Sequence, residues 1–157
     1  MKKVIFICLG NICRSPAAEA VFNKMVSSVG DSDISLSDSA GLHDYHSGEL
    51  ADSRMRKHSA RRGYHITSIS RKIIQADFQE FDLIVAMDKS VMISLKKLAR
   101  DTRSIEKIFL FTDFCNNKEY NEVPDPYYGG DLGFELVLDI LEDGMPNLIS
   151  ALLKVRS

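Results

Sequence analysis

The N-terminal segment constrains the fold of this 157-residue chain more than any other part. Residues 4–7 form a short, continuous apolar run, which is typical of a strand buried on both faces of a parallel sheet. Cys8 follows at the carboxyl end of this strand, where open α/β sheets bind ligands. After a short loop, Pro16 opens a predicted helix that Gly30 ends. The segment therefore predicts a strand, a loop and a helix in direct succession.

Short apolar runs and helical patterns alternate along the rest of the chain. Further strands are predicted at residues 34–40, 82–88 and 105–111, and further helices at residues 52–62, at residues 89–99 and from Leu132 onward. Pro146 is expected to kink or interrupt the last helix. Strands that alternate with helices predict an α/β fold in which helices cover both faces of a parallel sheet. The length suits one domain spanning residues 1–157.

Charge argues against nucleic acid as a partner. The formal net charge is −2 and basic residues are spread among acidic ones, so the electrostatic footprint of a nucleic-acid-binding protein is missing. The one basic cluster is interpreted as a solvated helix face, and attraction of a phosphorylated or acidic substrate is the alternative. Its members are Arg54, Arg56, Lys57, Arg61 and Arg62.

Hydropathy and cysteine content indicate the compartment. No apolar run approaches the roughly 20 residues that span a bilayer, and residues 1–8 are too short for a signal peptide. The three cysteines lack the spacing of a disulfide framework, and a reactive thiol survives best in a reducing compartment. We therefore expect a cytoplasmic protein that does not interact with membranes.

The loop after the first strand has residues suited to holding a phosphate. Gly10 and Asn11 can adopt unusual backbone angles, so the amides of residues 9–15 can curl inward as an anion-binding nest. The helix that follows adds the partial positive charge of its N terminus. Arg14 can hold two phosphoryl oxygens with its planar guanidinium. A nucleotide-binding P-loop is disfavoured because the lysine and hydroxyl that end such a motif are missing.

Cys8 lies in the same positive field and is interpreted as a nucleophile. A nearby cation and a helix N terminus favour the thiolate, so we expect Cys8 to be ionised at neutral pH. A thiolate can attack phosphorus in line and form a phosphocysteine intermediate. The hydroxyl of Ser15 is expected to hydrogen-bond this sulfur and stabilise it as the leaving group in the second step. For the cysteine considered alone, an inert buried side chain is the alternative.

The sequence resembles a known family along essentially its whole length. Residues 8–16, CLGNICRSP, are similar to the signature of the low-molecular-weight protein tyrosine phosphatases, and residues 125–128, DPYY, are similar to that family's general-acid loop. Shorter matches, DSA at 38–40, SR at 70–71 and AMD at 86–88, follow in the expected order. The resemblance implies a single three-layer domain with a four-stranded parallel sheet in the order 2-1-3-4. It also implies a phosphomonoesterase that needs no metal and no cofactor.

The resemblance further implies the residues of an active site. Asp125 matches the general acid, and Pro124 and Pro126 stiffen its loop. A turn aspartate that caps its own backbone is the alternative for this residue. Aromatic and apolar side chains are implied to form a deep slot that selects phosphotyrosine over phosphoserine. The implied substrate-binding residues are Leu9, Gly10, Asn11, Ile12, Cys13, Ser15, Tyr45, Tyr127 and Tyr128.

Polar residues behind the loop are implied to hold its strained backbone by hydrogen bonds. They are Asn11, Ser15 and Ser39. Ser68 stands where relatives often carry a histidine, which makes this part of the network depart from the family pattern. Asp88 is interpreted either as a supporting carboxylate or as the cap of the following helix.

Other cysteines and histidines have weaker claims to a function. Cys13 is a redox candidate because it shares the loop with Cys8 and the two thiols could close a reversible disulfide, and inert packing is the alternative. Cys115 is interpreted as a buried hydrophobic side chain. His43 and His46 lack further ordered ligands, so a structural or solvated role is favoured over a metal site.

Two alternative functions would use the same loop. Arsenate reductase on the same fold normally passes a disulfide to a further cysteine pair, and only Cys115 lies outside the loop. A phosphoryl carrier or phosphopeptide-binding module would not need Asp125. We therefore predict a phosphatase of tyrosine-phosphorylated proteins or small aryl phosphates, with phosphate as a product inhibitor. A monomer is expected, with a weak dimer as the alternative.

Overall fold

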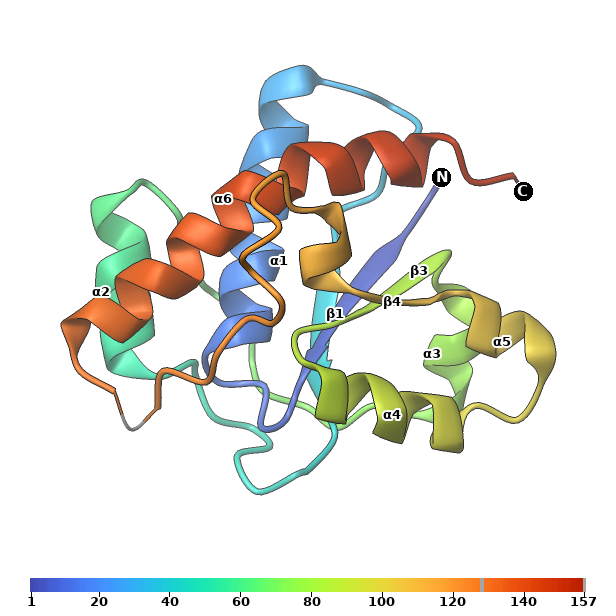
Figure 1. The fold of residues 1–157 in the computed structure, drawn as a ribbon, viewed down its shortest axis with the longest axis horizontal. Coiled ribbons are helices and arrows are strands. Elements are labelled where there is room, and N and C mark those ends of the chain that lie inside the picture. Colours follow the sequence, from blue (N-terminus) through green and yellow to red (C-terminus); the bar gives the residue numbers. More distant parts are fainter. Residues whose placement is uncertain (128, 157) are drawn as a thin grey trace.

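The sheet has the predicted number and order of strands. In the structure, a computed structural model that describes residues 1–127 and 129–156, four strands pair in parallel in the order β2-β1-β3-β4 (Figure 1). They are β1 (Val4–Cys8), β2 (Asp38–Gly41), β3 (Leu83–Ala86) and β4 (Ile108–Leu110). The chain runs from β1 to β2 on one side and returns to β3 on the other. Open α/β sheets bind ligands at such a reversal, beyond the carboxyl ends of the strands.

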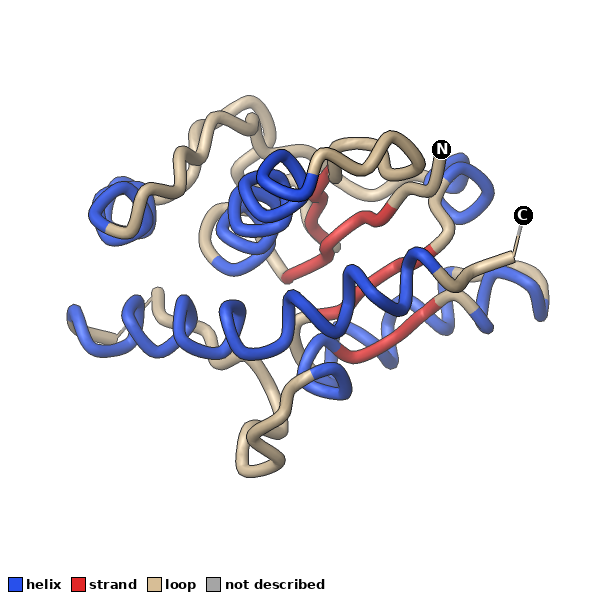
Figure 2. The backbone as a smooth tube through the Cα atoms, turned by 90° about the horizontal axis from the view of Figure 1, so that it is seen from above, coloured by secondary structure: helices blue, strands red, loops and turns tan. Residues whose placement is uncertain are grey.

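Helices cover both faces of this sheet, as Figure 2 shows. One face is covered by helices that pack on one another, namely α1 (Arg14–Val29), α2 (Ser53–Arg61) and α6 (Asp131–Leu153). The helices of the opposite side are α3 (Gln75–Glu80), α4 (Lys89–Leu98) and α5 (Thr102–Glu106). A 3₁₀ turn, η1 (Phe111–Phe114), packs against α6. The predicted layers of the fold are therefore confirmed.

Strand β1 anchors both cores of the molecule. Phe6 packs with residues of α1 and α6, whereas Ile5 and Ile7 pack with residues of α3 and α4, and all three are fully buried. The ring of Phe6 meets that of Phe22 in α1 edge to face, with 5.9 Å between centroids. Burial of an apolar side chain of this size stabilises a fold by ~1.5–3 kcal/mol. The end of β1, where Cys8 lies, is thus held on both faces.

The strand predicted at 82–88 is shorter in the structure, and two other predicted strands differ more in their bounds. The strand predicted at 34–40 begins only at Asp38, and Ile34 forms an isolated bridge with Lys2 instead. For the strand predicted at 105–111, both predicted bounds are wrong. Its first residues belong to α5, because the Asp101 side chain accepts the backbone N–H of Ser104 at 2.7 Å and caps that short helix.

Prolines act differently from the predictions. Helix α1 begins at Arg14 rather than at Pro16, and proline is tolerated there because the first-turn N–H groups lack partners within the helix. Pro146 lies inside α6 without ending it, so the predicted interruption is wrong. Pro146 is exposed while Met145 and Leu148 are fully buried. The carbonyl that loses its partner can therefore face water while the apolar face continues unbroken.

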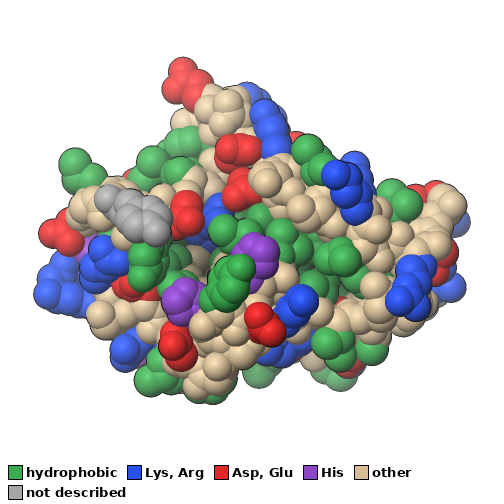
Figure 3. All heavy atoms as spheres, turned by 90° about the horizontal axis from the view of Figure 1, so that it is seen from below, with side chains coloured by type: hydrophobic (Ala, Val, Ile, Leu, Met, Phe, Trp, Pro, Cys, Tyr) green, Lys and Arg blue, Asp and Glu red, His purple; other side chains and the backbone are tan. Residues whose placement is uncertain are grey.

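The loops that follow β1 and β2 lie together at the lower edge of Figure 1. Figure 3 views this end of the molecule, where hydrophobic side chains surround a hollow beside histidine side chains. Cys8 ends β1, and Asp88, the first residue before α4, follows β3.

No helix in residues 1–127 and 129–156 is long and apolar enough to cross a membrane.

Candidate active site

Residues 8–15 form a tight loop, here called the phosphate loop, between β1 and α1. Asn11 adopts left-handed backbone angles, with φ of 56°, which asparagine tolerates better than most residues. Gly41, at the end of β2, lies directly behind the loop. A Cβ atom at Gly41 would approach the backbone of Leu9 and Gly10 to 3.0 Å. Glycine at this position therefore lets β2 support the loop from behind.

Buried polar side chains hold the phosphate loop in shape. The Asn11 amide donates to the hydroxyls of Ser15 at 2.8 Å and Ser39 at 3.0 Å, and its carbonyl accepts the backbone N–H of Arg71 at 3.0 Å. The structure thus brings together Asn11, Ser15 and Ser39. Asn11, Ser15 and Ser39 are at most 2% exposed.

Ser70 and Arg71 also hold the loop, and the sequence analysis did not assign them this role. The Ser70 hydroxyl donates to the carbonyl of Gly10 at 3.1 Å. Ser68, which stands where relatives often carry histidine, makes no side-chain hydrogen bond to the loop within the described residues. Ser70, two residues after Ser68, is the serine whose side chain reaches the loop.

The sulfur of Cys8 lies at the base of the phosphate loop. It accepts the backbone N–H of Asn11 at 3.3 Å and lies 3.0 Å from the hydroxyl oxygen of Ser15. Because that oxygen already accepts a hydrogen bond from the Asn11 amide, the hydroxyl hydrogen of Ser15 is available to the sulfur. Both interactions favour negative charge on sulfur, and the N terminus of α1 lies alongside.

Arg14 places a buried positive charge in the same cradle. Its Nη1 donates to a carboxylate oxygen of Asp88 at 2.6 Å and to the carbonyl of Val123 at 3.1 Å. Burial alone would lower the pKa of Arg14, but Cys8, Asp88 and Asp125 together raise it. Asp88 also caps α4 by accepting the backbone N–H of Val91 at 2.8 Å. The two interpretations offered for Asp88 are therefore both correct.

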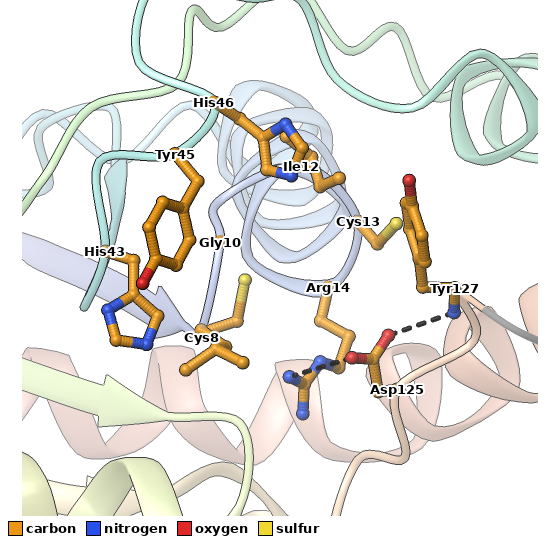
Figure 4. Close-up of a pocket in the computed structure, with 11 residues that line it drawn as sticks. Cys8, Gly10, Ile12, Cys13, Arg14, His43, Tyr45, His46, Asp125 and Tyr127 are labelled. Atoms are coloured by element: carbon orange, nitrogen blue, oxygen red, sulfur yellow. Dashed lines mark hydrogen bonds and ion pairs between the residues drawn. The ribbon is translucent and has the colours of Figure 1, made fainter.

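A pocket of about 330 Å³ opens above the phosphate loop (Figure 4). Its floor and walls are formed by Cys8, Leu9, Gly10, Ile12, Cys13, Arg14, His43, Tyr45, His46, Asp125 and Tyr127. Figure 4 shows Tyr45 and Tyr127 on opposite sides of the cysteine. Tyr128, also predicted to bind substrate, lies outside the described residues. Residues from three distant parts of the sequence thus meet around one cavity.

Asp125 reaches this pocket from the loop before α6. One carboxylate oxygen lies 3.9 Å from Nη2 of Arg14, and the other accepts the backbone N–H of Tyr127 at 2.9 Å. The second contact is the turn-capping role that was the alternative for this residue. It leaves the first oxygen directed toward the guanidinium, as Figure 4 shows. The capping contact and the approach to Arg14 therefore coexist in one side chain.

Two histidines line the pocket, although the sequence analysis assigned neither to it. The His43 ring lies 4.9 Å from that of Tyr45 between centroids, and His46 Nδ1 lies 2.8 Å from a carboxylate oxygen of Glu49. Both belong to the loop that also carries Tyr45. In the sequence, the signal for this placement was that both histidines stand close to Tyr45, which is predicted to bind substrate.

Glu19 lies in α1 behind the phosphate loop, close to Ser39. One of its carboxylate oxygens is buried and has no hydrogen-bond partner among the described residues. Burial is the largest cause that raises the pKa of Glu19 from 4.5 to about 7, and the nearby charge of Asp38 adds to it. The folded chain therefore favours the protonated form of this carboxyl group.

We expect the Glu19→Gln variant to be more stable than the wild type above neutral pH. The stabilisation from a raised pKa is complete below pH 4.5 and is lost as pH rises through about 7. Because glutamine cannot ionise, the variant should gain about 1–2 kcal/mol in the free energy of unfolding at alkaline pH. Urea denaturation across this pH range measures the difference. Glu119→Gln, at an exposed position, is the control, and equal pH profiles for wild type and Glu19→Gln would contradict the prediction.

Sequence and structure comparisons agree on the relationships of the chain. Residues 3–157 match the family described as low molecular weight phosphotyrosine protein phosphatase. A putative low molecular weight protein-tyrosine-phosphatase of Synechocystis is 43% identical over 152 residues, 96% of each chain. The human low molecular weight phosphotyrosine protein phosphatase is 39% identical over 137 residues, covering 87% of this chain and 86% of that one.

The solved structures extend this likeness to the fold. A crystal structure of a protein tyrosine phosphatase from Entamoeba histolytica, with Hepes in its active site, superposes with a TM-score of 0.93. It is 48% identical in sequence, and the match covers 98% of both chains. This chain belongs to the low molecular weight phosphotyrosine protein phosphatase family.

Proposed function

We propose that this protein hydrolyses phosphotyrosine and small aryl phosphates through a phosphocysteine intermediate on Cys8. The observation that carries the proposal is the Asp125 carboxylate, 3.9 Å from the buried guanidinium of Arg14 in the pocket that Cys8 lines (Figure 4). An anion anchor, a nucleophile and a proton donor surround one cavity. A phosphopeptide-binding module would need only the anchor.

The first half-reaction transfers the phosphoryl group to sulfur. The Cys8 thiolate attacks phosphorus, an S–P bond forms, and the P–O bond to the aryl group breaks. Asp125 gives its proton to the leaving oxygen, so that a phenol departs rather than a phenolate. Arg14 and the loop amides hold the other oxygens, and their fixed positive charge stabilises the negative charge of the transition state.

The second half-reaction returns the enzyme to its starting state. Asp125, now a carboxylate, takes a proton from water as the water oxygen attacks phosphorus. The S–P bond breaks, and the electron pair returns to the Cys8 sulfur, 3.0 Å from the Ser15 hydroxyl oxygen. A hydrogen bond from this hydroxyl makes sulfur a better leaving group. Orthophosphate is then released. It also inhibits the enzyme as a product, because its oxygens can bind where the phosphoryl oxygens of the substrate bind.

The walls of the pocket support selection for an aromatic phosphate ester. Tyr45 and Tyr127 face the cavity from opposite sides (Figure 4), and Leu9 and Ile12 add apolar surface to its lining. A phenyl ring between these side chains is removed from water, whereas the short side chain of phosphoserine leaves them exposed. We therefore propose tyrosine-phosphorylated proteins as substrates of a monomeric enzyme in the cytoplasm.

Turnover of para-nitrophenyl phosphate in the presence of EDTA tests the proposed function. We expect hydrolysis without added metal, hydrolysis of a phosphotyrosine peptide, and no hydrolysis of the matched phosphoserine peptide. Complete inhibition by EDTA would contradict the mechanism. Binding of the phosphotyrosine peptide without turnover would instead favour a binding module, and thiol-dependent reduction of arsenate without phosphatase activity would favour an arsenate reductase.

We also propose that Cys13 protects Cys8 from overoxidation. Cys13 lines the same pocket and is 3% exposed. Burial, followed by the charges of Asp52, Cys8 and Asp125, raises the pKa of Cys13, so Cys8 is the thiol that peroxide attacks. Peroxide oxidises Cys8 to a sulfenic acid, and the Cys13 sulfur then forms an S–S bond while water leaves.

Peroxide treatment followed by mass spectrometry is expected to reveal a Cys8 to Cys13 disulfide, with activity restored by dithiothreitol. The Cys13→Ser variant should instead accumulate the sulfinic form of Cys8 and lose activity irreversibly, because no second thiol can intercept the sulfenic acid. Cys115→Ser is the matched control and should behave as the wild type. Free Cys13 beside oxidised Cys8 would contradict the proposal.

A further inference from the structure

His58 joins α2 to the first turn of α6. Its side chain is 4% exposed, and its ring stacks on that of Phe134 with 5.5 Å between centroids and an interplanar angle of 7°. Nδ1 lies 2.5 Å from a carboxylate oxygen of Glu135, and Nε2 lies 3.2 Å from one of Asp131. An ionised carboxylate only accepts hydrogen bonds, so the ring is the donor in such a contact. The His58 ring is therefore held between two carboxylates of α6.

The charged groups around this ring favour the same arrangement. Arg62 donates to the second carboxylate oxygen of Glu135 at 2.8 Å and forms ion pairs with Asp139 and Glu142. The hydrogen bond from Arg62, and then that from His58, lowers the pKa of Glu135 and keeps it ionised. His58 in α2 and Arg62, which caps the end of α2, thus face a row of carboxylates on α6. Of the two, His58 contacts the very start of α6.

The start of α6 is also one end of the loop that carries Asp125. Only residues 126–130 separate the two, and the last of them, Gly129 and Gly130, have no side chains. Gly130 is the residue before the helix and has no side chain with which to cap it. The position of the carboxyl group therefore depends on contacts that fix both ends of the connection.

Arg54 links these contacts to the pocket. Its Nη2 donates to the carbonyl of Tyr127 at 2.9 Å, and its guanidinium lies 4.9 Å from the ring centroid of Phe134, the ring on which His58 stacks. The Tyr127 backbone N–H in turn donates to Asp125. A continuous series of contacts runs from the buried His58 ring to the carboxyl group in the pocket.

We infer that His58 is a positioning residue for Asp125, acting through the start of α6. The inference rests on the proposed function, in which Asp125 protonates the leaving oxygen. Loss of the two hydrogen bonds releases the first turn of α6, and the carboxyl group then spends less time within reach of that oxygen. A small displacement of a catalytic group lowers its contribution strongly. Poor leaving groups, which need the proton most, suffer the larger loss.

The leaving-group dependence of kcat/KM tests this inference. With phenyl phosphate, we expect kcat/KM of His58→Gln to fall about tenfold below the wild type. With 2,4-dinitrophenyl phosphate, whose leaving group needs no proton, the two should agree within about twofold. Asp131→Asn, at a side chain that is 87% exposed, weakens one of the two contacts by removing its negative charge, without disturbing the core. It should show a smaller loss with the same dependence on leaving group.

Controls separate this inference from the proposed function. His65→Gln changes an exposed histidine that follows α2 and should match the wild type with both substrates. Equal losses with both substrates in His58→Gln and Asp131→Asn, or no loss in either, would overturn the positioning role. Absence of turnover by the wild type, or full activity of Cys8→Ser, would instead refute the proposed function.

Discussion

Substitution of Cys8 by serine is expected to abolish turnover of para-nitrophenyl phosphate. The sulfur lies at the base of the phosphate loop, where it accepts the backbone N–H of Asn11 and lies 3.0 Å from the Ser15 hydroxyl oxygen. Serine keeps the shape of the side chain but replaces a group that ionises readily by one that does not. Without the thiolate, no phosphocysteine forms, and water is not activated for direct attack. The initial rate at saturating substrate measures the effect.

Two measurements show that this loss comes from chemistry. Cys8→Ser should still bind orthophosphate, because Arg14 and the loop amides remain, and should keep the wild-type unfolding transition. Cys115→Ser should keep full activity. Cys115 is also buried, at 1% exposure, but it lies between η1 and α6. Substantial turnover by Cys8→Ser would rule out covalent catalysis by this residue.

The segment around Cys8 is where sequence and structure agree most closely. Four apolar residues in succession predict a strand buried on both faces, and β1 supplies Ile5 and Ile7 to one core and Phe6 to the other. The loop residues follow the strand without interruption, so their positions are fixed by local sequence. Asn11 with positive φ and Gly30 at the end of α1 are likewise local features that residue type predicts.

The missed elements depend on contacts between distant residues. Helices α3 and α5 are five or six residues long and carry no helical repeat of apolar residues that could be recognised. Each is held by a capping aspartate and by neighbours. Asp77, for example, accepts the backbone N–H of Ile74 at 2.9 Å and pairs with Arg71. Such helices are determined by tertiary structure.

The same distinction applies to the pocket. Asp125 was identified by a motif, but its distance from Arg14 follows from how the loop before α6 folds back over the phosphate loop. The SR match at 70–71 gave Ser70 no role, and His43 belonged to no motif. Their contacts come from the paths of two connections that pass beside residues 8–15. Sequence therefore predicted the groups that take part in the chemistry better than those that hold the loop and line its rim.

Substitution of Asp125 by alanine should lower kcat/KM for phenyl phosphate by about 10²–10⁴, the usual contribution of a general acid. The carboxyl group lies at the pocket mouth on a loop stiffened by Pro124 and Pro126, with one oxygen 3.9 Å from Arg14. The loss of kcat/KM in Asp125→Ala should be smaller for 2,4-dinitrophenyl phosphate, whose phenolate leaves without a proton. A loss should still be measured in kcat, because hydrolysis of the phosphocysteine needs the same residue as a base.

The dependence on pH distinguishes a proton donor from a residue that only shapes the pocket. With Asp125 present, kcat/KM for phenyl phosphate should fall on the alkaline side as the carboxyl group loses its proton, and this limb should be absent in Asp125→Ala. Asp113→Ala, at an exposed aspartate of η1, should retain both the wild-type rate and the wild-type profile. An unchanged alkaline limb in Asp125→Ala would assign the proton to another group, because a residue that only shapes the pocket changes the rate at every pH alike.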